Sequence, residues 1–327
     1  MNTELRAKPP LVIIAGPTAS GKSAAAVALA HRLNGAVISA DSMQVYRGMD
    51  IGSAKITEAE RKNIPHYLID CAEPDEEWNV VRFQKEAART VREIAARGQL
   101  PILCGGTGFY IQALLYDIDF TETEEDAAYR EELSAFAAKR GAEALHERLR
   151  AADPEAAESI HPHNIKRVIR ALEFVRQSGG QRISEHNREQ RLKKAAYRAV
   201  FFALTMNRAT LYERIDRRVD RMFGQGLIGE VTRLRERGFT DRDVSMQGLG
   251  YKEVLRALDG QYSMEEAKER IRKETRHFSK RQLSWFRRER DVTWIDRDAF
   301  PDENAMLDRM EAQIREELCI FSQETQG

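Results

Sequence analysis

Residues Gly16-Pro17-Thr18-Ala19-Ser20-Gly21-Lys22-Ser23 match the phosphate-binding pattern G-x-x-x-x-G-K-[ST] at every fixed position. Apolar residues 11–15 predict a buried strand before this loop, and the Ala-rich spacing of residues 23–33 predicts a helix after it. In that context the loop glycines let backbone N–H groups converge on phosphate oxygens, and the helix N-terminus adds partial positive charge. Lys22 would neutralise a terminal phosphate, and the Ser23 hydroxyl would hold Mg²⁺. The pattern predicts a phosphate site and leaves the phosphate compound open.

Short apolar runs and helical patterns alternate through the first hundred residues. Further strands are predicted at residues 36–40, 66–69 and 101–104, and a helix at residues 80–96. Strands that alternate with helices are typical of a parallel, doubly wound sheet. The sequence therefore predicts an α/β fold whose core is a P-loop NTPase-like parallel sheet flanked by helices.

The character of the chain changes after residue 120. Residues 121–128 are acidic and Thr-rich, and residues 129–180 show helical spacing with no strand signal. Asn164 is a plausible N-cap for a helix whose apolar face includes Val168 and Leu172. A dense strand signal at residues 199–204 then returns the chain to the sheet. We predict an all-helical insertion at residues 121–197, inside an α/β core made of residues 1–120 and 198–327 with C-terminal helices.

Charge is distributed unevenly along a chain whose total is neutral. The 327 residues contain 52 Lys and Arg against 52 Asp and Glu, which on its own argues against a nucleic-acid partner. Residues 160–290 nevertheless hold 31 basic and 17 acidic side chains, whereas residues 1–159 hold 18 and 25 and residues 291–327 hold 3 and 10. The basic block, residues 160–290, could therefore meet a polyanion, although a solvated helical surface is the ordinary explanation of such charge.

Composition excludes some classes of protein. No apolar run approaches the ~20 residues of a membrane-spanning helix, and the mean hydropathy is −0.56, so we expect no membrane association. Three separated cysteines form neither a disulfide framework nor a zinc site. The first ten residues lack the apolar core of a secretory signal, so a cytoplasmic location is expected.

Two further loops follow predicted strands. Asp41 comes directly after residues 36–40, at the sheet edge where ligands of open α/β sheets bind, and its carboxylate could act as a general base or serve Mg²⁺ indirectly. Gly105-Gly106-Thr107-Gly108 follows residues 101–104 and places a hydroxyl at the same edge. A helix N-cap Asp and a tight turn with an N-cap Thr are the structural alternatives. The chain lacks the N/T-K-x-D motif of a GTPase and the apolar strand ending in Asp-Glu of an ATPase motor.

These motifs, taken in order, closely resemble the bacterial tRNA dimethylallyltransferases. The matching segments are GPTASGKS at 16–23, DSMQVYRGMDIGSAK at 41–55, PHYLID at 65–70, GGTGFY at 105–110, KRVIRALE at 166–173, RIDRRV at 214–219, QGLGYK at 247–252 and KRQLSW at 280–285. Any one segment is weak evidence, but the ordered set spans about residues 11–294.

The resemblance implies transfer of the dimethylallyl group from dimethylallyl diphosphate to the N6 amine of adenosine 37, beside the anticodon of tRNA. Residues 16–23 and Mg²⁺ would then hold the diphosphate of an isoprenoid. Asp41 would be the general base, Thr107 would lie beside the reacting groups and touch the tRNA, and Arg218 would reach the diphosphate. Arg214, Arg218 and Arg221 recur at helical spacing, so they predict one basic stripe.

The same resemblance implies that the tRNA anticodon stem-loop presents a flipped-out adenosine. The expected tRNA contacts are Asp41, Ser42, Met43, Gln44, Thr107, Arg130, Lys166, Arg167, Val168, Ile169, Arg170, Gln247, Gly248, Leu249, Gly250, Tyr251, Lys252, Lys280, Arg281 and Gln282. Trp285 could stack on a base, although a core Trp is the commoner case. Gly108 departs from the family, which often has a bulky residue there, and the chain lacks the Cys/His zinc finger of eukaryotic relatives. A monomer without an obligate protein partner is expected.

Other functions remain open from the sequence. An adenylate isopentenyltransferase of the cytokinin type shares the P-loop and the Asp. The basic block and the helical insertion favour a large polyanion over a free nucleotide. A P-loop small-molecule kinase and a non-catalytic RNA-binding protein are more distant alternatives, and the intact P-loop with Asp41 argues against the second of these.

Overall fold

A computed structural model describes residues 8–120 and 126–319, which fold into two compact units. The α/β unit consists of Met1–Asp117 and Ala195–Gly327, and the helical unit consists of Ile118–Lys194. The helical unit covers nearly the same stretch as the insertion predicted at residues 121–197. No helix in the described ranges is long and apolar enough to span a membrane.

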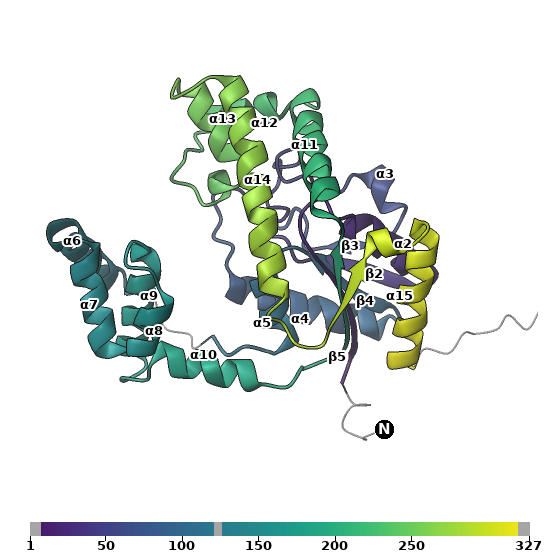
Figure 1. Ribbon diagram of the computed structural model, residues 1–327, viewed down its shortest axis with the longest axis horizontal. Helices are drawn as coiled ribbons and strands as arrows, with labels where there is room; N and C mark the ends of the chain where they lie inside the picture. The colour runs from purple at the N-terminus through teal and green to yellow at the C-terminus, as the bar shows by residue number, and fades with distance from the viewer. Residues whose placement is uncertain (1–7, 121–125, 320–327) are drawn as a thin grey trace, which may run out of the picture. The chain divides into compact units, whose positions relative to one another are not determined.

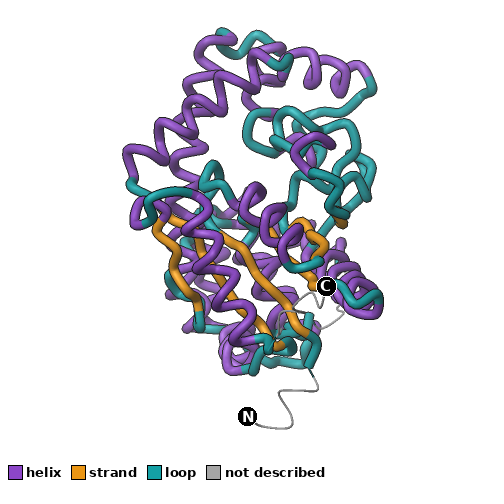
Figure 2. The backbone as a smooth tube through the Cα atoms, turned by 90° about the vertical axis from the view of Figure 1, so that its right-hand side faces the viewer, coloured by secondary structure: helices purple, strands orange, loops and turns teal. Residues whose placement is uncertain are grey.

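Six parallel strands form the sheet of the α/β unit, in the order β3-β2-β4-β1-β5-β6. The strands are β1 Pro10–Ala15, β2 Gly35–Ser39, β3 His66–Tyr67, β4 Leu100–Gly105, β5 Arg198–Thr205 and β6 Val292–Asp296. Figure 2 shows the strands side by side with helices around them. The predicted fold class and five of the strands are confirmed. The sixth, β6, was not predicted: its sequence, VTWID, is short, mixed in polarity and flanked by charged residues.

The helices of the α/β unit are α2 Lys22–Arg32, α3 Glu58–Arg61, α4 Val80–Ala96, α5 Gly108–Leu115, α11 Arg208–Gly224, α12 Leu227–Glu236, α13 Tyr251–Leu258, α14 Met264–Phe286 and α15 Glu303–Glu317, with 3₁₀ turns η1 Ser245–Gln247 and η2 Arg297–Ala299. The prediction of a helix at residues 80–96 is confirmed: Asn79 caps α4 through Arg82 N, and Phe83, Ala87 and Val91 form its buried face. In Figure 1, α11, α12, α13 and α14 stand above the sheet.

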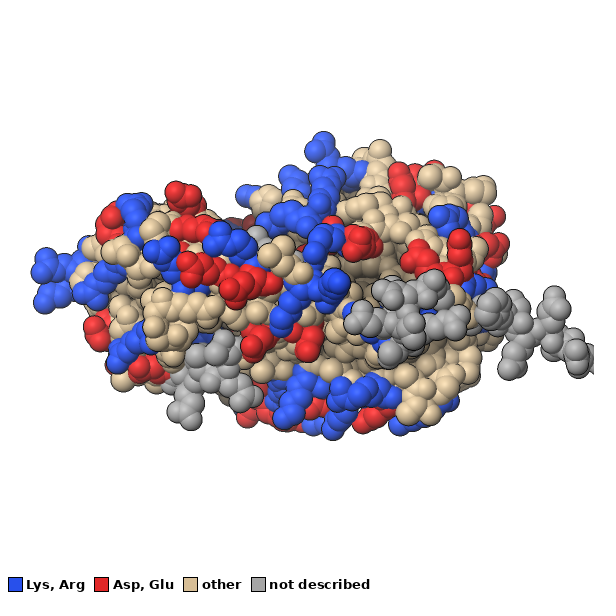
Figure 3. Space-filling view, turned by 90° about the horizontal axis from the view of Figure 1, so that it is seen from below, with Lys and Arg blue, Asp and Glu red and all other residues tan. Residues whose placement is uncertain are grey.

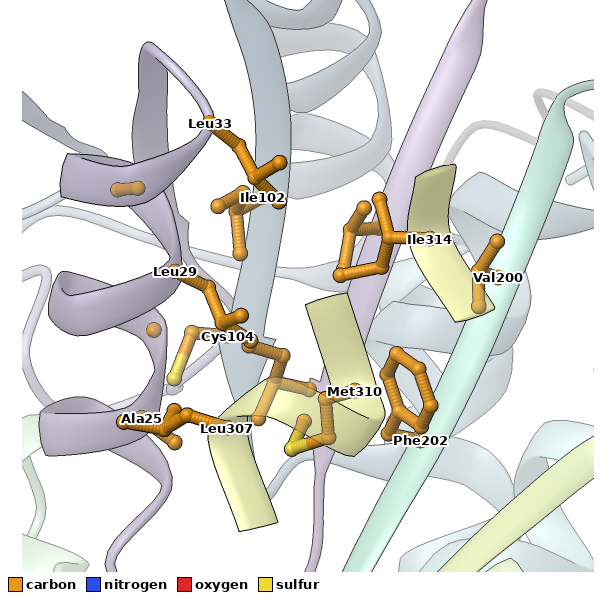
Figure 4. Close-up of a cluster of buried hydrophobic side chains, with 14 of the residues drawn as sticks. Ala25, Leu29, Leu33, Ile102, Cys104, Val200, Phe202, Leu307, Met310 and Ile314 are labelled. Carbon is orange, nitrogen blue, oxygen red and sulfur yellow. The ribbon is translucent and has the colours of Figure 1, made fainter. Parts of the chain in front are cut away.

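A single apolar cluster joins α2 and α15 to one face of the sheet (Figure 4). Leu29 of α2 and Met310 of α15 pack with Ile102 of β4 and Phe202 of β5, and all four side chains are buried. Full burial of each such side chain contributes roughly 1.5–3 kcal/mol. The cluster fixes the central strands and therefore the positions of the loops that follow them.

The helical unit contains α6 Ala127–Arg140, α7 Ala142–Ala152, α8 Pro154–Ser159, α9 Ile165–Gln177 and α10 Ile183–Leu192. Leu133, Leu149, Val168 and Leu172 are among its core residues. Asn164 occupies the predicted N-cap position of α9, although its side chain makes no capping hydrogen bond. The helical unit therefore has a small hydrophobic core of its own.

Candidate active site

The P-loop connects β1 to α2 and holds its lysine inside the loop. Lys22 Nζ donates a hydrogen bond of 2.6 Å to the Pro17 carbonyl. Burial lowers the pKa of the Lys22 ammonium to about 8, with Arg218 acting in the same direction and Cys104 and Asp41 opposing it. The Lys22 ammonium is therefore positioned to bind a phosphate. The negative charge of a bound phosphate would raise the pKa of Lys22 back toward its ordinary value.

Asp41 follows β2, and its side chain has two distinct oxygens. Oδ1 accepts hydrogen bonds from Met43 N at 2.9 Å and from Gln44 N at 3.4 Å, which closes a local turn. Among the described residues, Oδ2 has no hydrogen-bond donor. The N-cap alternative is therefore half right: Asp41 caps a turn and not a helix. One carboxylate oxygen orients the group while the other can receive a proton.

Thr107 lies in the loop after β4, beside the Asp41 turn. Its backbone N–H donates to the Ala40 carbonyl at 3.2 Å, and its Oγ1 accepts a hydrogen bond from Ser42 N at 3.3 Å. Thr107 occupies the N-cap position of α5, as its alternative interpretation predicted, but its hydroxyl makes no capping bond there. The structure thus brings together the loops after β2 and β4, as their positions at the strand ends predicted.

Two of the three arginines of the predicted stripe on α11 contact loops of the site: Arg218 contacts the loop after β2, and Arg214 contacts the P-loop. Arg218 Nη2 donates to the Ser53 carbonyl at 3.4 Å, and Arg214 Nε donates to the Ala19 carbonyl at 2.9 Å. Arg214 and Arg221 are both exposed, and the Arg221 guanidinium makes no hydrogen bond to the described residues. Burial lowers the pKa of Arg218, and the nearby Asp41 carboxylate opposes that shift. A guanidinium remains charged under these conditions, so Arg218 supplies a second cation at the site.

Gln282 of α14 joins the P-loop to the loop after β4. Its Oε1 accepts a hydrogen bond of 2.8 Å from Thr18 N, and its Nε2 donates to the Gly106 carbonyl at 3.0 Å. The side chain is 6% exposed. Gln282 was expected to contact tRNA; the structure places it as a bridge between two loops of the site.

Gly108 makes room for Trp285, a neighbour from α14. A Cβ at Gly108 would collide with the indole ring, and Phe109 packs edge-on against the same ring with centroids 6.1 Å apart. Trp285 Nε1 is buried without a hydrogen-bond partner in the described ranges. The departure from the family pattern at Gly108 therefore goes with close packing of Trp285 on the loop.

Sequence reasoning did not include Arg297, which also contacts the P-loop. Arg297 lies in η2, directly after β6, and its Nη1 donates to the Ser20 carbonyl at 3.2 Å. No signal pointed to it, because β6 was not predicted and Arg297 belongs to the acidic end of the chain. Arg214 and Arg297 together fix two consecutive carbonyl groups of the loop.

The expected tRNA-contacting residues fall into three groups by exposure. Lys166, Arg167, Arg170, Gln247, Lys280 and Arg281 are exposed; Asp41, Ser42, Met43, Gln44, Thr107, Arg130, Gly248, Leu249 and Lys252 are half-buried. Val168 and Ile169 belong to the core of the helical unit, and Gly250, Tyr251 and Gln282 are also buried. The side chains of the buried group are not available on a surface of the described structure. Their expected tRNA contacts stay predictions.

Within the helical unit, a buried glutamate organises two of these arginines. Arg130 binds Glu173 through both Nε, at 2.8 Å, and Nη2, at 2.9 Å, and Arg170 Nη1 lies 2.9 Å from Glu173 Oε2. Burial acts to raise the pKa of Glu173, but the hydrogen bonds from the two arginines lower it overall. Lys166 and Arg167, one turn earlier on α9, project into solvent.

The comparisons with known proteins agree on one family. A family model described as IPP transferase matches residues 44–289, and another described as isopentenyl transferase matches residues 9–77. The tRNA dimethylallyltransferase of Lachnoclostridium phytofermentans is 51% identical over 311 residues, which cover 95% of this chain and 99% of that protein. The chain belongs to the tRNA dimethylallyltransferase family.

Solved structures of family members have the same fold as this chain. A tRNA isopentenylpyrophosphate transferase from Bacillus halodurans is 45% identical with a TM-score of 0.72, covering 95% of this chain and 97% of that one. A eukaryotic dimethylallyltransferase, solved acting on tRNA, is 29% identical with a TM-score of 0.81 and covers 97% and 81%. As a member of the tRNA dimethylallyltransferase family, the protein is a transferase that modifies tRNA, as the motif resemblance indicated.

Proposed function

We propose that the protein transfers the dimethylallyl group of dimethylallyl diphosphate to N6 of adenosine 37, next to the anticodon of tRNA. One observation supports this most: the P-loop, Asp41, Thr107 and Arg218 meet at the carboxyl edge of one sheet, with Asp41 acting electrostatically on both cations, Lys22 and Arg218. Such an edge offers anion-holding groups beside a proton acceptor. Diphosphate departure and amine deprotonation need these two functions.

In the proposed reaction, the N6 lone pair attacks C1 of the dimethylallyl group, and the bond from C1 to the diphosphate oxygen breaks. Its electron pair leaves with the diphosphate, whose charge the loop N–H groups, Lys22 and Arg218 stabilise. The exocyclic amine is a weak nucleophile, because its lone pair is delocalised into the ring. Asp41 takes the N6 proton through Oδ2, while Oδ1 stays bonded to Met43 N.

A Mg²⁺ ion fits the residues of this site. Ser23 is exposed at the start of α2, where its hydroxyl could bind the ion, and the nearby Asp41 could serve the ion indirectly, through a water molecule, while its Oδ2 remains the proton acceptor. No group of three or more His, Cys, Asp or Glu side chains in that part could hold a metal by itself. Mg²⁺ commonly takes one or two protein ligands and completes its shell with phosphate and water. When bound, it would neutralise charge on the leaving diphosphate.

In the proposed complex, exposed basic residues contact the phosphates of the RNA, and the target base lies at the site around Asp41. Lys166, Arg167, Lys280 and Arg281 are exposed basic residues of two of the matched segments. On the face seen in Figure 3, the Lys and Arg side chains of the described residues are interspersed with Asp and Glu. That face therefore presents no broad, unbroken basic surface to RNA. An adenosine stacked in its loop must leave the stack to reach Asp41.

A direct assay tests the proposal. The protein is mixed with Mg²⁺, labelled dimethylallyl diphosphate and either unmodified tRNA or AMP; a parallel mixture contains ATP and small acceptors. We expect label on tRNA, at adenosine 37 after nuclease digestion. Label on AMP alone would support the adenylate isopentenyltransferase, and phosphate transfer from ATP would support a kinase. Either result overturns the proposal.

The exposed pair Lys166 and Arg167 provides a prediction about tRNA affinity. Replacing both with alanine is expected to weaken tRNA binding. If each side chain binds one phosphate, each replacement should also reduce the slope of log K against log salt by about 1. Filter-binding titrations at several salt concentrations measure the slope. Lys62→Ala, which removes an exposed cation outside the matched segments, is the control. An unchanged slope would indicate that Lys166 and Arg167 are part of a solvated helix face and contact no phosphate.

Gln282 provides a prediction about the donor. Gln282→Leu removes the hydrogen bond that Gln282 Oε1 accepts from Thr18 N and the one that Gln282 Nε2 donates to the Gly106 carbonyl. Each is worth about 1 kcal/mol, so we expect the KM for dimethylallyl diphosphate to rise by up to about 30-fold. Steady-state kinetics at saturating tRNA measure this. Gln313→Leu, which breaks a bond of 2.9 Å from α15 to Thr293, is the matched control. A change confined to the KM for tRNA would instead support the RNA contact expected from the sequence.

A further inference from the structure

Glu230 is a buried carboxylate outside every matched motif. It lies on α12 and is 3% exposed. Its two oxygens accept hydrogen bonds from three consecutive backbone groups: Asp50 N at 2.9 Å, Ile51 N at 2.9 and 3.1 Å, and Gly52 N at 3.0 Å. The Tyr251 hydroxyl adds a fourth donor at 2.7 Å. Four donors around one buried carboxylate form a fully satisfied anionic centre.

The surroundings of Glu230 require this arrangement. A Cβ at Gly52 would collide with the Tyr251 ring, so the backbone approaches the tyrosine only because residue 52 is glycine. The Tyr251 oxygen donates to Glu230 and accepts a hydrogen bond of 3.1 Å from Ser53 N. Burial raises the pKa of Tyr251 well above its usual value, and the Glu230 carboxylate acts in the same direction. The phenol therefore stays protonated and keeps its donor role.

The segment held by Glu230 leads to the candidate active site. The Ser53 carbonyl, one residue beyond the three N–H donors, accepts the hydrogen bond from Arg218. Lys55 braces the segment from its other side, through the Tyr46 carbonyl at 2.8 Å and the Asp50 carboxylate at 2.6 Å. The Ser53 carbonyl that orients Arg218 thus belongs to a loop whose backbone is held by the Glu230 carboxylate of α12.

We propose that Glu230 is a positioning residue for the transfer reaction. It holds residues 50–52, and through Ser53 it sets the place of the Arg218 guanidinium at the diphosphate site. The proposal rests on the proposed function in one respect, the role of Arg218 toward the diphosphate. It extends that function to a residue that touches neither substrate, and Tyr251 is its partner in the same task.

Glu230→Gln is the decisive variant. An amide keeps the volume of the side chain but presents an NH₂ group to backbone N–H donors, so at least one of them loses its acceptor. We expect kcat/KM for dimethylallyl diphosphate to fall about 10- to 100-fold, the range typical of partners that orient a functional group. Tyr251→Phe, which leaves the three backbone bonds of Glu230 intact, is expected to have a smaller effect.

A double-mutant cycle separates positioning from simple loss of stability. In an Arg218→Ala background, Glu230→Gln is expected to change kcat/KM by less than about twofold, because the group through which it acts is gone. Equal factors in both backgrounds would overturn the proposal. So would a lower Tm with unchanged kcat/KM. Asp153→Asn, at a fully buried carboxylate that accepts hydrogen bonds from Ala156 N and Ser184 N, is the control: it should lower Tm without changing the KM for the diphosphate substrate.

Binding of inorganic diphosphate gives a readout that does not depend on the transfer activity. Isothermal titration should show weaker binding to Glu230→Gln than to the wild-type protein, and no further weakening when Arg218 is already alanine. If the wild-type protein fails to prenylate tRNA, the proposed function fails, and this titration still tests the link between Glu230 and Arg218. Identical affinities for wild-type protein and Glu230→Gln would refute the link.

Discussion

Asp41→Asn is expected to lower the turnover number for tRNA prenylation by about 10²- to 10⁴-fold, the range typical of the removal of a general base. The amide oxygen can still accept the hydrogen bond from Met43 N, so the turn after β2 survives. What disappears is the proton-accepting oxygen. Because the turn survives, we expect tRNA affinity to stay within about twofold of the wild-type value.

The comparison with Asp41→Ala sharpens this test. Alanine removes the base and the acceptor of the turn together, so it should lower turnover at least as much and also lower Tm. Single-turnover assays at saturating tRNA, with filter binding in parallel, measure the two quantities. Near wild-type turnover in Asp41→Asn, with a decrease only in Asp41→Ala, would show that the residue is structural.

Lys22→Met is expected to reduce kcat/KM for dimethylallyl diphosphate by about 10²- to 10³-fold, because hydrogen bonds to charged groups at a desolvated site are worth about 2–5 kcal/mol. Methionine keeps the length of the side chain and removes the ammonium that donates to Pro17 O. Lys273→Met, at an exposed lysine of α14 outside the matched segments, controls for the removal of one charge. Equal reductions in the two variants would mean that the P-loop lysine does not meet the diphosphate.

The pKa of Lys22 also predicts how diphosphate binding depends on pH. Burial lowers that pKa to about 8, so the free protein loses the ammonium charge as the pH rises through 8. Inorganic diphosphate should favour the protonated form, and its affinity should fall by up to about tenfold per pH unit above 8. Titrations between pH 7 and 9.5 measure this, and Lys22→Met should remove most of the dependence. A wild-type affinity that is flat across the range would contradict the assignment.

Much of the fold could be predicted from local patterns. The P-loop with its flanking strand and helix, the helix over residues 80–96 and the strand after the helical unit were all recognised, because apolar periodicity and caps act over a few residues. By contrast β6 was missed: Val292, Trp294 and Ile295 favour a strand, but the run is only five residues long and stands among charged residues, and its pairing with β5 depends on contacts made elsewhere in the fold. Missing β6 also hid Arg297.

The sequence by itself determined that a phosphate loop, an acidic turn and a threonine loop follow parallel strands, and hence that they share one sheet edge. Only the tertiary structure decided which distant side chains complete that edge. Gln282 reaches Thr18 across 264 positions, and Glu230 reaches Gly52 across 178. Neither approach leaves a local pattern, because nothing near residue 282 or residue 230 in the chain specifies a partner loop. The physical reason is burial: packing of α12 and α14 removes these polar groups from water, and each then needs the backbone partner that the fold supplies.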